Sequence, residues 1–147
     1  MSIESLKNKA QKIVNLFIRL RDAKIRNGKL YATCLTCGRE WELITATDKR
    51  KYHSGHYFKE HQFSPVRYEH DNMRGQCSVC NKDQHGQMGI FKRNLILEIG
   101  QERFDILNYK RNQIKKWTAL ELEQVITEHK KLLAGPEMIE KLKIYSN

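Results

Sequence analysis

Four cysteines in two C-x-x-C pairs are the residues of this chain best suited to chemistry. The first pair is Cys34 and Cys37, followed by Gly38, and the second is Cys77 and Cys80. Two residues between thiolates let both sulfurs reach one metal from a tight turn, which the glycine suits. Four thiolates satisfy the tetrahedral preference of zinc, as is typical of a structural site. The sequence therefore predicts a structural Zn2+ site that ties two distant segments together.

Other uses of the four cysteines stay open on sequence alone. A redox C-x-x-C needs only one pair and a thioredoxin-like βαβ context, which the sequence lacks. Unpaired buried thiols and an iron–sulfur cluster are the remaining alternatives. Zinc is favoured, but zinc alone does not decide the function, because four-cysteine sites occur in binding modules as well as in enzymes.

The loop between the two pairs carries a candidate catalytic cluster. His53 and His56 lie in the segment His-Ser-Gly-His-Tyr-Phe, and Asn81 directly follows Cys80. Histidine is a natural general base because its unperturbed pKa lies near neutrality. Asn81 offers a carbonyl oxygen to a hard cation, and His53 can supply a nitrogen. A base beside such a cation suits phosphodiester hydrolysis, although any one histidine could equally be a surface or hydrogen-bonded residue.

The chain carries a formal net charge of +10, which is distributed unevenly. Residues 1–30 hold eight basic and two acidic residues, for +6, whereas residues 31–100 and 101–147 hold +2 each. Such an excess suits a polyanion, with nucleic acid as the first candidate and a merely solvated surface as the alternative. No run of 18 apolar residues predicts a membrane span, and the N-terminus is not of the signal-peptide type. We therefore expect a protein that works inside a cell.

Hydrophobic periodicity predicts helices around a strand-and-loop centre. Apolar residues three and four apart predict a helix over residues 3–26, with docking on its own core favoured over a dimer seam. Residues 29–58 suit short strands, and the polar residues 59–76 suit a loop. A helical stripe over residues 88–99 and a T-x-x-E capping box at Thr118 predict helices in the remainder.

The predicted fold class is therefore α+β, with a zinc-stabilised core flanked by N-terminal and C-terminal helices. The predicted units are a basic helix at 1–28, a core at 29–110 and a helical extension at 111–147. Neither an internal repeat nor a low-complexity tract interrupts this order.

The order of the short motifs resembles a known class of nucleases. Together the motifs resemble the HNH, or ββα-metal, nucleases that carry a zinc knuckle, and more closely the Rap/NinG family of lambdoid-phage recombination nucleases. The resemblance covers roughly residues 30–110 and implies a zinc-stabilised ββα-metal (HNH-like) core. The second cysteine pair with Gly86-Gln87-Met88 is also similar to the phage recombination endonuclease VII family. The motifs are Gly55-His56-Tyr57, Pro65-Val66-Arg67-Tyr68, Asn72, Cys77 to Asn81 and a helix closing at Gly100.

The resemblance implies a role for each matching residue. His56 matches the general base, and Asn81 matches a metal ligand at the start of a helix. Asn72 matches the asparagine that holds the loop between the strands, and Arg67 matches an arginine that contacts phosphate or braces this loop. Further basic residues are expected to contact DNA phosphates, which dominate affinity for nucleic acid. These are Arg50, Lys51, Arg74 and Lys82.

One position departs from the wider HNH pattern. That pattern has a metal-binding Asp just before the base, but Gly55 stands there in this chain. His53 is the first substitute, and Asp48 and Asp71 are others. Without any of them, cation affinity would be weak or the protein would be a catalytically inactive binder. Among the remaining histidines, His129 is expected on a helix surface, and no role is assigned to His61, His70 and His85.

These expectations combine into a Mg2+- or Mn2+-dependent endonuclease that acts on DNA. Branched recombination intermediates such as Holliday junctions are implied as substrates by the resemblance. Two alternatives stay open: a non-catalytic zinc-dependent DNA-binding protein, and an HNH nuclease that cuts linear duplex. A homodimer would suit cutting both strands of a two-fold-symmetric junction. The resemblance also implies a protein encoded by a phage or prophage and located in the cytoplasm of a bacterial host.

Overall fold

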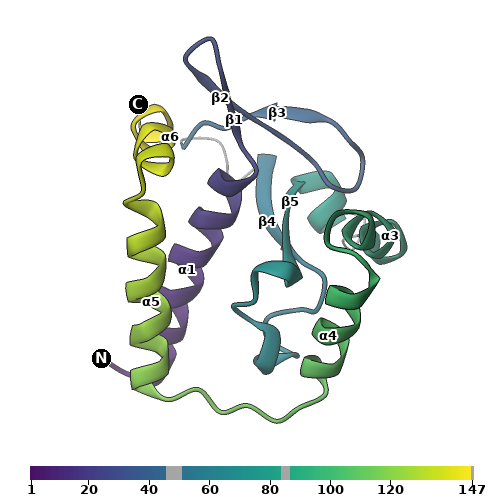
Figure 1. Ribbon diagram of the computed structural model, residues 1–147, viewed down its shortest axis with the longest axis vertical. Coiled ribbons are helices and arrows are strands. Elements are labelled where there is room, and N and C mark those ends of the chain that lie inside the picture. The colour runs from purple at the N-terminus through teal and green to yellow at the C-terminus, as the bar shows by residue number, and fades with distance from the viewer. Residues whose placement is uncertain (46–50, 84–86, 147) are drawn as a thin grey trace.

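Helices lie on both sides of two small antiparallel sheets in the computed structural model, which describes residues 1–45, 51–83 and 87–146 (Figure 1). The α+β fold class predicted from the sequence is confirmed, whereas the ββα-metal core stays a prediction. The helices are α1 (Ile3–Arg21), α3 (Met88–Ile99), α4 (Gln101–Arg111), α5 (Ala119–Leu133) and α6 (Pro136–Ser146). The strands are β1 (Lys24–Arg26), β2 (Lys29–Thr33), β3 (Glu40–Glu42), β4 (Tyr52–His56) and β5 (Met73–Cys77). Two 3-10 turns, η1 (Ser64–Val66) and η2 (His70–Asn72), and one π-helical turn, η3 (Val79–Asp83), complete the described elements.

Helix α1 packs its apolar face inside the chain. The side chain of Ser2 accepts a hydrogen bond from the backbone N–H of Ser5, which satisfies one of the free donors at the helix start. The buried residues Ala10, Val14 and Ile18 belong to a core that α1 shares with α5, and the two helices run side by side in Figure 1. Docking on its own core, the interpretation favoured from the sequence, is therefore confirmed.

The helix predicted over residues 3–26 is wrong beyond Arg21. Residues Lys24–Arg26 form β1, which pairs antiparallel with β2. Asn27 and Gly28 both adopt left-handed backbone angles, with φ of 52° and 72°. An Asn-Gly pair of this kind is the preferred two-residue turn of a β-hairpin, and it outweighs the helical periodicity here.

The loop predicted over residues 59–76 also ends early, because Met73–Cys77 forms β5. This strand pairs with β4 in a register that sets His56 opposite Met73 and Tyr52 opposite Cys77. All five of its residues are buried, including the polar Arg74 and Gln76. Its polar composition is typical of a loop, so the sequence pattern concealed a central strand.

Strands β4 and β5 lie between two hydrophobic cores. Tyr52 and Met73 belong to the core built with α1, α5 and α6, whereas Phe58 belongs to a second core with Phe91 and Phe104 of α3 and α4. Packing on both sides holds this strand pair in place, and with it the two histidines of β4. None of the described helices is long and apolar enough to cross a membrane.

The C-terminal helices follow their sequence signals. The side chain of Thr118 accepts from the backbone N–H of Glu121, whose carboxylate accepts from the N–H of Thr118, so the predicted capping box is confirmed. Gly100 ends α3 with a φ of 88°, a conformation that favours glycine. Lys141 of α6 is buried and donates to the carbonyl oxygen of Leu20 at 2.9 Å, which stabilises the C-terminal end of α1.

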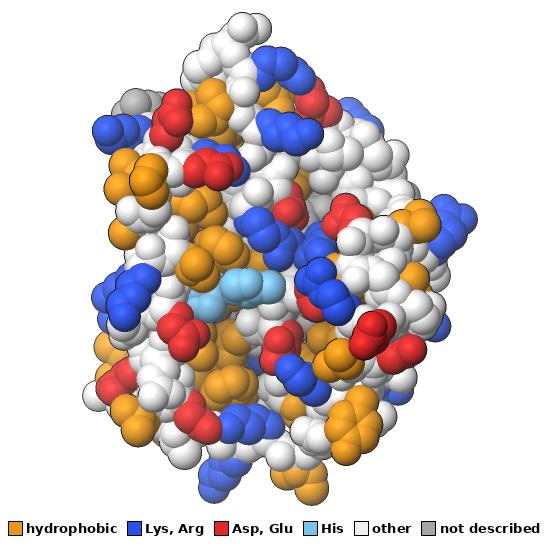
Figure 2. Space-filling model, viewed as in Figure 1, with side chains coloured by type: hydrophobic (Ala, Val, Ile, Leu, Met, Phe, Trp, Pro, Cys, Tyr) orange, Lys and Arg blue, Asp and Glu red, His pale blue; other side chains and the backbone are white. Residues whose placement is uncertain are grey.

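A histidine pair fastens α5 to the centre of the molecule. His129 of α5 is buried, so the expectation of a surface histidine is wrong. Its Nδ1 lies 2.7 Å from the carbonyl oxygen of Val125, which places a proton there and leaves Nε2 as an acceptor. Nε2 of His70 lies 2.7 Å from this acceptor and therefore donates to it. The pair lines a cavity of about 390 Å3, and histidine side chains are visible in this hollow in Figure 2.

Acidification is expected to weaken this contact. Burial, the neighbouring His129 and Arg21 lower the pKa of His70 to about 4, against the opposing effect of Asp71. Because this pKa lies below the ordinary value of 6.5, the stability contributed by neutral His70 is fully present above pH 6.5. It is lost as the pH falls towards 4. We expect the unfolding free energy to fall by about 1–2 kcal/mol between pH 7 and pH 5, measured by urea unfolding.

His70→Gln keeps a donor for His129 but takes up no proton in this range, so its stability should depend less on pH. His61→Gln is the matched control, because the side chain of His61 is 79% exposed, and it should keep the wild-type dependence. An unchanged pH dependence in His70→Gln would contradict the coupling of this pair to stability.

Candidate functional site

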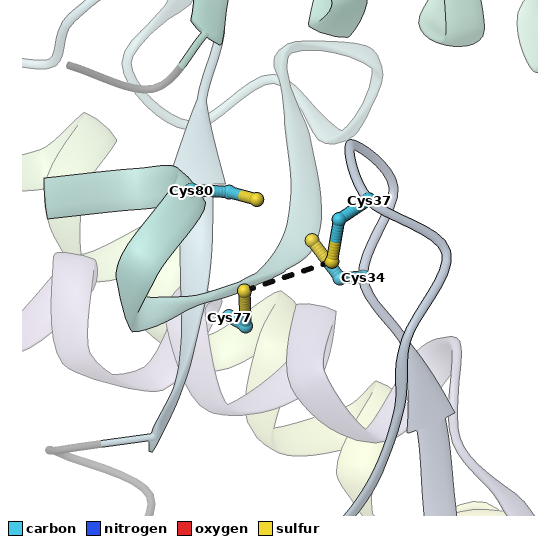
Figure 3. Close-up of side chains that lie close together, drawn as sticks. All are labelled: Cys34, Cys37, Cys77 and Cys80. Atoms are coloured by element: carbon cyan, nitrogen blue, oxygen red, sulfur yellow. Dashed lines mark hydrogen bonds between the residues drawn. The ribbon is translucent and has the colours of Figure 1, made fainter. Parts of the chain in front are cut away.

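The four predicted cysteine ligands come together from three segments. Cys34 and Cys37 lie in the turn after β2, Cys77 ends β5, and Cys80 lies in η3. Their Sγ atoms all lie within 4.8 Å of one another, and those of Cys37 and Cys77 are 3.9 Å apart (Figure 3). Zinc–sulfur bonds place the corners of a tetrahedron ~3.8 Å apart. The cluster therefore fits one tetrahedral ion and indicates a structural zinc site.

The backbone around the cluster favours charged sulfur. Burial raises the pKa of Cys77 and of Cys80. Burial also acts on Cys34, but hydrogen bonds from the backbone at Cys37, Cys77 and Thr36 outweigh it and lower the pKa of this thiol. Because the thiolate is the form that binds metal, these N–H groups prepare the cluster for a cation. Neither a redox pair nor unpaired thiols would require the convergence of all four sulfurs.

Two adjoining cavities of about 280 and 730 Å3 run over β4 and share part of their walls. We call them together the β4 groove, which is lined by His53, Ser54 and His56 of β4, by Asn15 of α1 and by Asn81 of η3. His56 lines the smaller cavity and His53 the larger, whereas the other three line both. The structure thus brings the predicted base and the predicted cation ligands to one groove.

Asn81 and His53 are in direct contact within this groove. Nδ2 of Asn81 lies 3.0 Å from Nδ1 of His53. Asn81 directly follows Cys80, so the cysteine cluster fixes its position relative to β4. The amide oxygen and the imidazole nitrogen can converge on one cation when the amide turns its oxygen towards the ring.

His56 is enclosed by a side chain of α1 and by one from the loop that follows β4. Its side chain is 10% exposed, and its Nε2 lies 3.2 Å from Nε2 of Gln11 and 3.9 Å from Oε2 of Glu60. Burial lowers the pKa of His56, and the negative charge of Glu60 opposes this shift. Sequence reasoning missed Gln11, although a glutamine between Ala10 and Val14 on an otherwise apolar helix face was a signal.

Gly55 has no room for the acidic side chain that the HNH pattern places there. A Cβ at this position would lie 2.1 Å from Oε1 of Gln76, a buried residue that donates to Thr36. Asp71, one of the proposed substitutes, forms an ion pair with Arg103. Asp48 lies outside the described residues. His53 is therefore the substitute that the structure sets beside Asn81.

Asn72 is fully buried and holds the loop that follows β4. Its Oδ1 accepts from the backbone N–H of Phe58 at 2.8 Å, and its Nδ2 donates to the carbonyl oxygens of Phe58 and Val66. These contacts belong to a residue that shapes the loop. Asn72 lines neither cavity of the β4 groove, so any effect on chemistry acts through the position of His56.

Two of the arginines predicted to contact DNA are buried and engaged within the protein. Nε of Arg67 donates to Oε1 of Gln11 at 3.0 Å, which agrees with the bracing alternative. Nε of Arg74 donates to Glu98 at 2.6 Å, and its NH1 donates to backbone carbonyl oxygens. The phosphate contact predicted for Arg74 is therefore corrected, because its strand lies inside the protein.

Other basic residues do reach the β4 groove. Lys82 lines the larger cavity, and Lys51 is exposed just before β4. Arg50 and His85 lie outside the described residues. Three further basic side chains line the groove but were not predicted from the sequence, since two of them come from α1, which is far from β4 along the chain. These are Lys12, Arg19 and Lys59.

The fold and the site define an α+β protein with a cluster of four cysteines suited to zinc, beside a groove lined by histidines and basic residues. Residues 2–137 match the family model described as Bacteriophage Lambda NinG protein, so the chain belongs to the NinG family of lambdoid phage proteins. It is 30% identical over 124 residues to protein ninG of Escherichia phage lambda, which covers 84% of this chain and 53% of that protein. Protein ninG of Salmonella phage P22 is 29% identical over 126 residues, which covers 84% and 54%. The chain thus spans about half the length of these relatives. No solved structure matches it.

Proposed function

We propose that this protein is a metal-dependent endonuclease that cuts DNA, with branched recombination intermediates such as four-way junctions as its substrates. It would act in the cytoplasm of the bacterial host. The observation that carries the proposal is the β4 groove, in which a buried imidazole at His56 lies alongside the contacting pair of His53 and Asn81. The choice of branched DNA as substrate rests on the resemblance to recombination nucleases, and membership of the NinG family is consistent with it.

The chemistry follows from the positions of these side chains. His56 is nearly enclosed and its pKa is lowered by burial, so it is neutral at physiological pH and can accept a proton. A water molecule in the smaller cavity can give one of its protons to His56 while the water oxygen attacks phosphorus. The bond from phosphorus to the leaving oxygen then breaks on the opposite side. A divalent cation bound nearby would stabilise the charge on the phosphate and on the leaving oxygen.

His53 and Asn81 fit a borderline divalent cation. One imidazole nitrogen and one amide oxygen leave most coordination positions open for water and phosphate oxygens. Because nitrogen ligands suit transition metals better than magnesium, this pair of donors favours Mn2+ over Mg2+. Glu60 is the carboxylate among the described residues that line the groove, and it lies on the His56 side.

Basic side chains along the groove suit a phosphate backbone. Lys12 and Arg19 come from α1, Lys59 follows β4 and Lys82 lies in η3, so positive charge borders both cavities. Such contacts dominate affinity for DNA and make it sensitive to salt. They also give the N-terminal helix, the most basic segment of the chain, a place in substrate binding.

One observation favours a second candidate, a non-catalytic zinc-dependent DNA-binding protein. Gly55 leaves no room for a carboxylate beside the base, so the groove offers a cation fewer charged ligands than the HNH pattern does. That candidate explains the cysteines and the basic groove but gives the enclosed His56 no chemical role. A nuclease acting on linear duplex would use the same groove and differs only in its substrate.

Cleavage of matched substrates separates these candidates. The zinc-loaded protein is incubated with a four-way junction and with linear duplexes of the same sequences, with Mn2+, with Mg2+ or with neither. We expect cleavage of the junction with Mn2+ exceeding that with Mg2+, and at least ~10-fold slower cleavage of linear DNA. Equal cleavage of both substrates would favour the linear-duplex nuclease. Binding without any cleavage would favour the non-catalytic binder.

A further inference from the structure

Gln11 brings the N-terminal helix into contact with the proposed base. It is 6% exposed, although it lies on a helix face that otherwise buries apolar residues. Its Nε2 lies 3.2 Å from Nε2 of His56 and 2.9 Å from Oδ1 of Asn15, while its Oε1 accepts from Arg67 at 3.0 Å. Both donors and the acceptor of this buried amide are therefore engaged, and one donor faces the imidazole.

Arg67 fixes which way the amide of Gln11 points. A guanidinium group has donors and no acceptor, so the atom of Gln11 that faces Arg67 must be the carbonyl oxygen. The NH2 group must then face His56 and Asn15. Turning the amide over would set donor against donor in a buried position, which is costly.

The orientation of this amide decides the tautomer of His56. An NH2 group can only donate to a neutral imidazole, so Nε2 of His56 must be the acceptor. The ring proton then lies on Nδ1. We infer that Gln11, held by Arg67, is a positioning residue that keeps His56 in the tautomer whose Nε2 lone pair can take a proton from water in the β4 groove. This inference rests on the proposed function.

Gln11 also favours the neutral form of the base. A proton on Nε2 of His56 would face the N–H of Gln11, whereas the lone pair accepts from it. A water that enters the groove shares or displaces this hydrogen bond, and Arg67 keeps the amide in place. β5 contributes the apolar Met73 opposite His56, and α1 contributes neutral amides. The charged and titratable groups around His56 come from the loop after β4 and are Lys59, Glu60, His61 and Arg67.

Gln11→Glu tests the inference with a change of only a few atoms. The carboxylate can still bind Arg67, but it offers His56 an acceptor in place of a donor, so Nε2 should become protonated. We expect the pKa of His56, followed by NMR, to rise by about one unit or more. Because the base works only when neutral, the acid limb of the kcat/KM profile should move to higher pH by the same amount. A side chain at position 11 that does not face Nε2 of His56 would move neither readout.

Asn8→Asp is the matched control, since it makes the same amide-to-acid change at an exposed position of α1. It should leave the pKa of His56 and the acid limb within ~0.2 units of the wild type, because exposed charges are screened. An equal shift in both variants would show a general charge effect and overturn the inference. So would an unmoved His56 in a folded Gln11→Glu variant.

The wild-type protein offers a second readout that needs no variant. The nitrogen chemical shifts of neutral His56 should show the proton on Nδ1, and a proton on Nε2 would overturn the inference even if Gln11→Glu does not fold. These shifts also separate the inference from the proposed function. A protein that cuts no DNA but shows the Nδ1-protonated ring and the Gln11→Glu shift would refute the nuclease and keep Gln11 as the residue that positions His56.

Discussion

His56→Ala is expected to lower the rate of DNA cleavage by about 10²–10⁴-fold while the fold and the zinc content stay as in the wild type. The loss follows because the imidazole of His56 lines the smaller cavity, where water that displaces the contact with Gln11 can give its proton to Nε2. The fold should survive because His56 belongs to neither hydrophobic core and its ring contacts polar side chains. The rate is measured as single-turnover cleavage of a four-way junction with Mn2+. Binding of the same junction is measured without added Mn2+, so that a loss of chemistry can be told from a loss of binding.

His61→Ala is the matched control for this loss. His61 lines the same cavity five residues later and contacts the same Glu60, but its side chain is 79% exposed. Its loss should change the rate by less than ~3-fold, because an exposed histidine is poorly held for proton transfer. Similar losses in both variants would indicate that charge in the cavity matters and that His56 is not the base.

The pH profile gives the same assignment a second test. Burial lowers the pKa of His56, and a base is active only when it is unprotonated. The acid limb of the wild-type profile should therefore lie below pH 6.5, the ordinary value for histidine. A limb at or above that value would mean that another group controls the rate.

The parts of the site that were predictable from the sequence depend on chemistry or on neighbours along the chain. Four thiolates in two C-x-x-C pairs have few uses inside a cell, so their type and spacing were enough to predict that they converge. Asn81 directly follows Cys80, so the predicted cysteine cluster also predicts where Asn81 lies. The capping box at Thr118 is equally local, since its two hydrogen bonds join residues three apart.

The missed parts depend on contacts between distant segments. Gln11 meets His56 across 45 positions of the chain, and hydrophobic periodicity does not indicate which strand a helix will cover. His129 was expected at the surface because an imidazole on a helix is usually solvated, yet its partner His70 lies 59 positions away. The burial of Arg74 in β5 needed Glu98 on α3 as a partner, so composition alone pointed to a loop.

Cys77→Ser is expected to remove the zinc and most of the stability of the folded chain. Binding of structural zinc contributes ~10–16 kcal/mol in small zinc-binding peptides, which is comparable to the entire stability of an ordinary domain. Cys77 also ends β5, so loss of the metal would loosen the strand that pairs with β4. Elemental analysis should fall from about one zinc per chain to almost none, and the midpoint of thermal unfolding should fall by more than about 10 °C.

Ser78→Ala is the control, because it changes the same turn without removing a sulfur, and it should keep both the zinc and the midpoint. A Cys77→Ser protein with the wild-type midpoint would contradict a structural metal and leave the convergence of the four thiols to explain. The groove provides a further consequence. Asn81 is held beside His53 by its neighbour Cys80, so partial loss of zinc at low temperature should reduce cleavage before the helical core of α1 and α5 unfolds. Cleavage that persists after the zinc is lost would instead show that the β4 groove does not depend on the cysteine cluster.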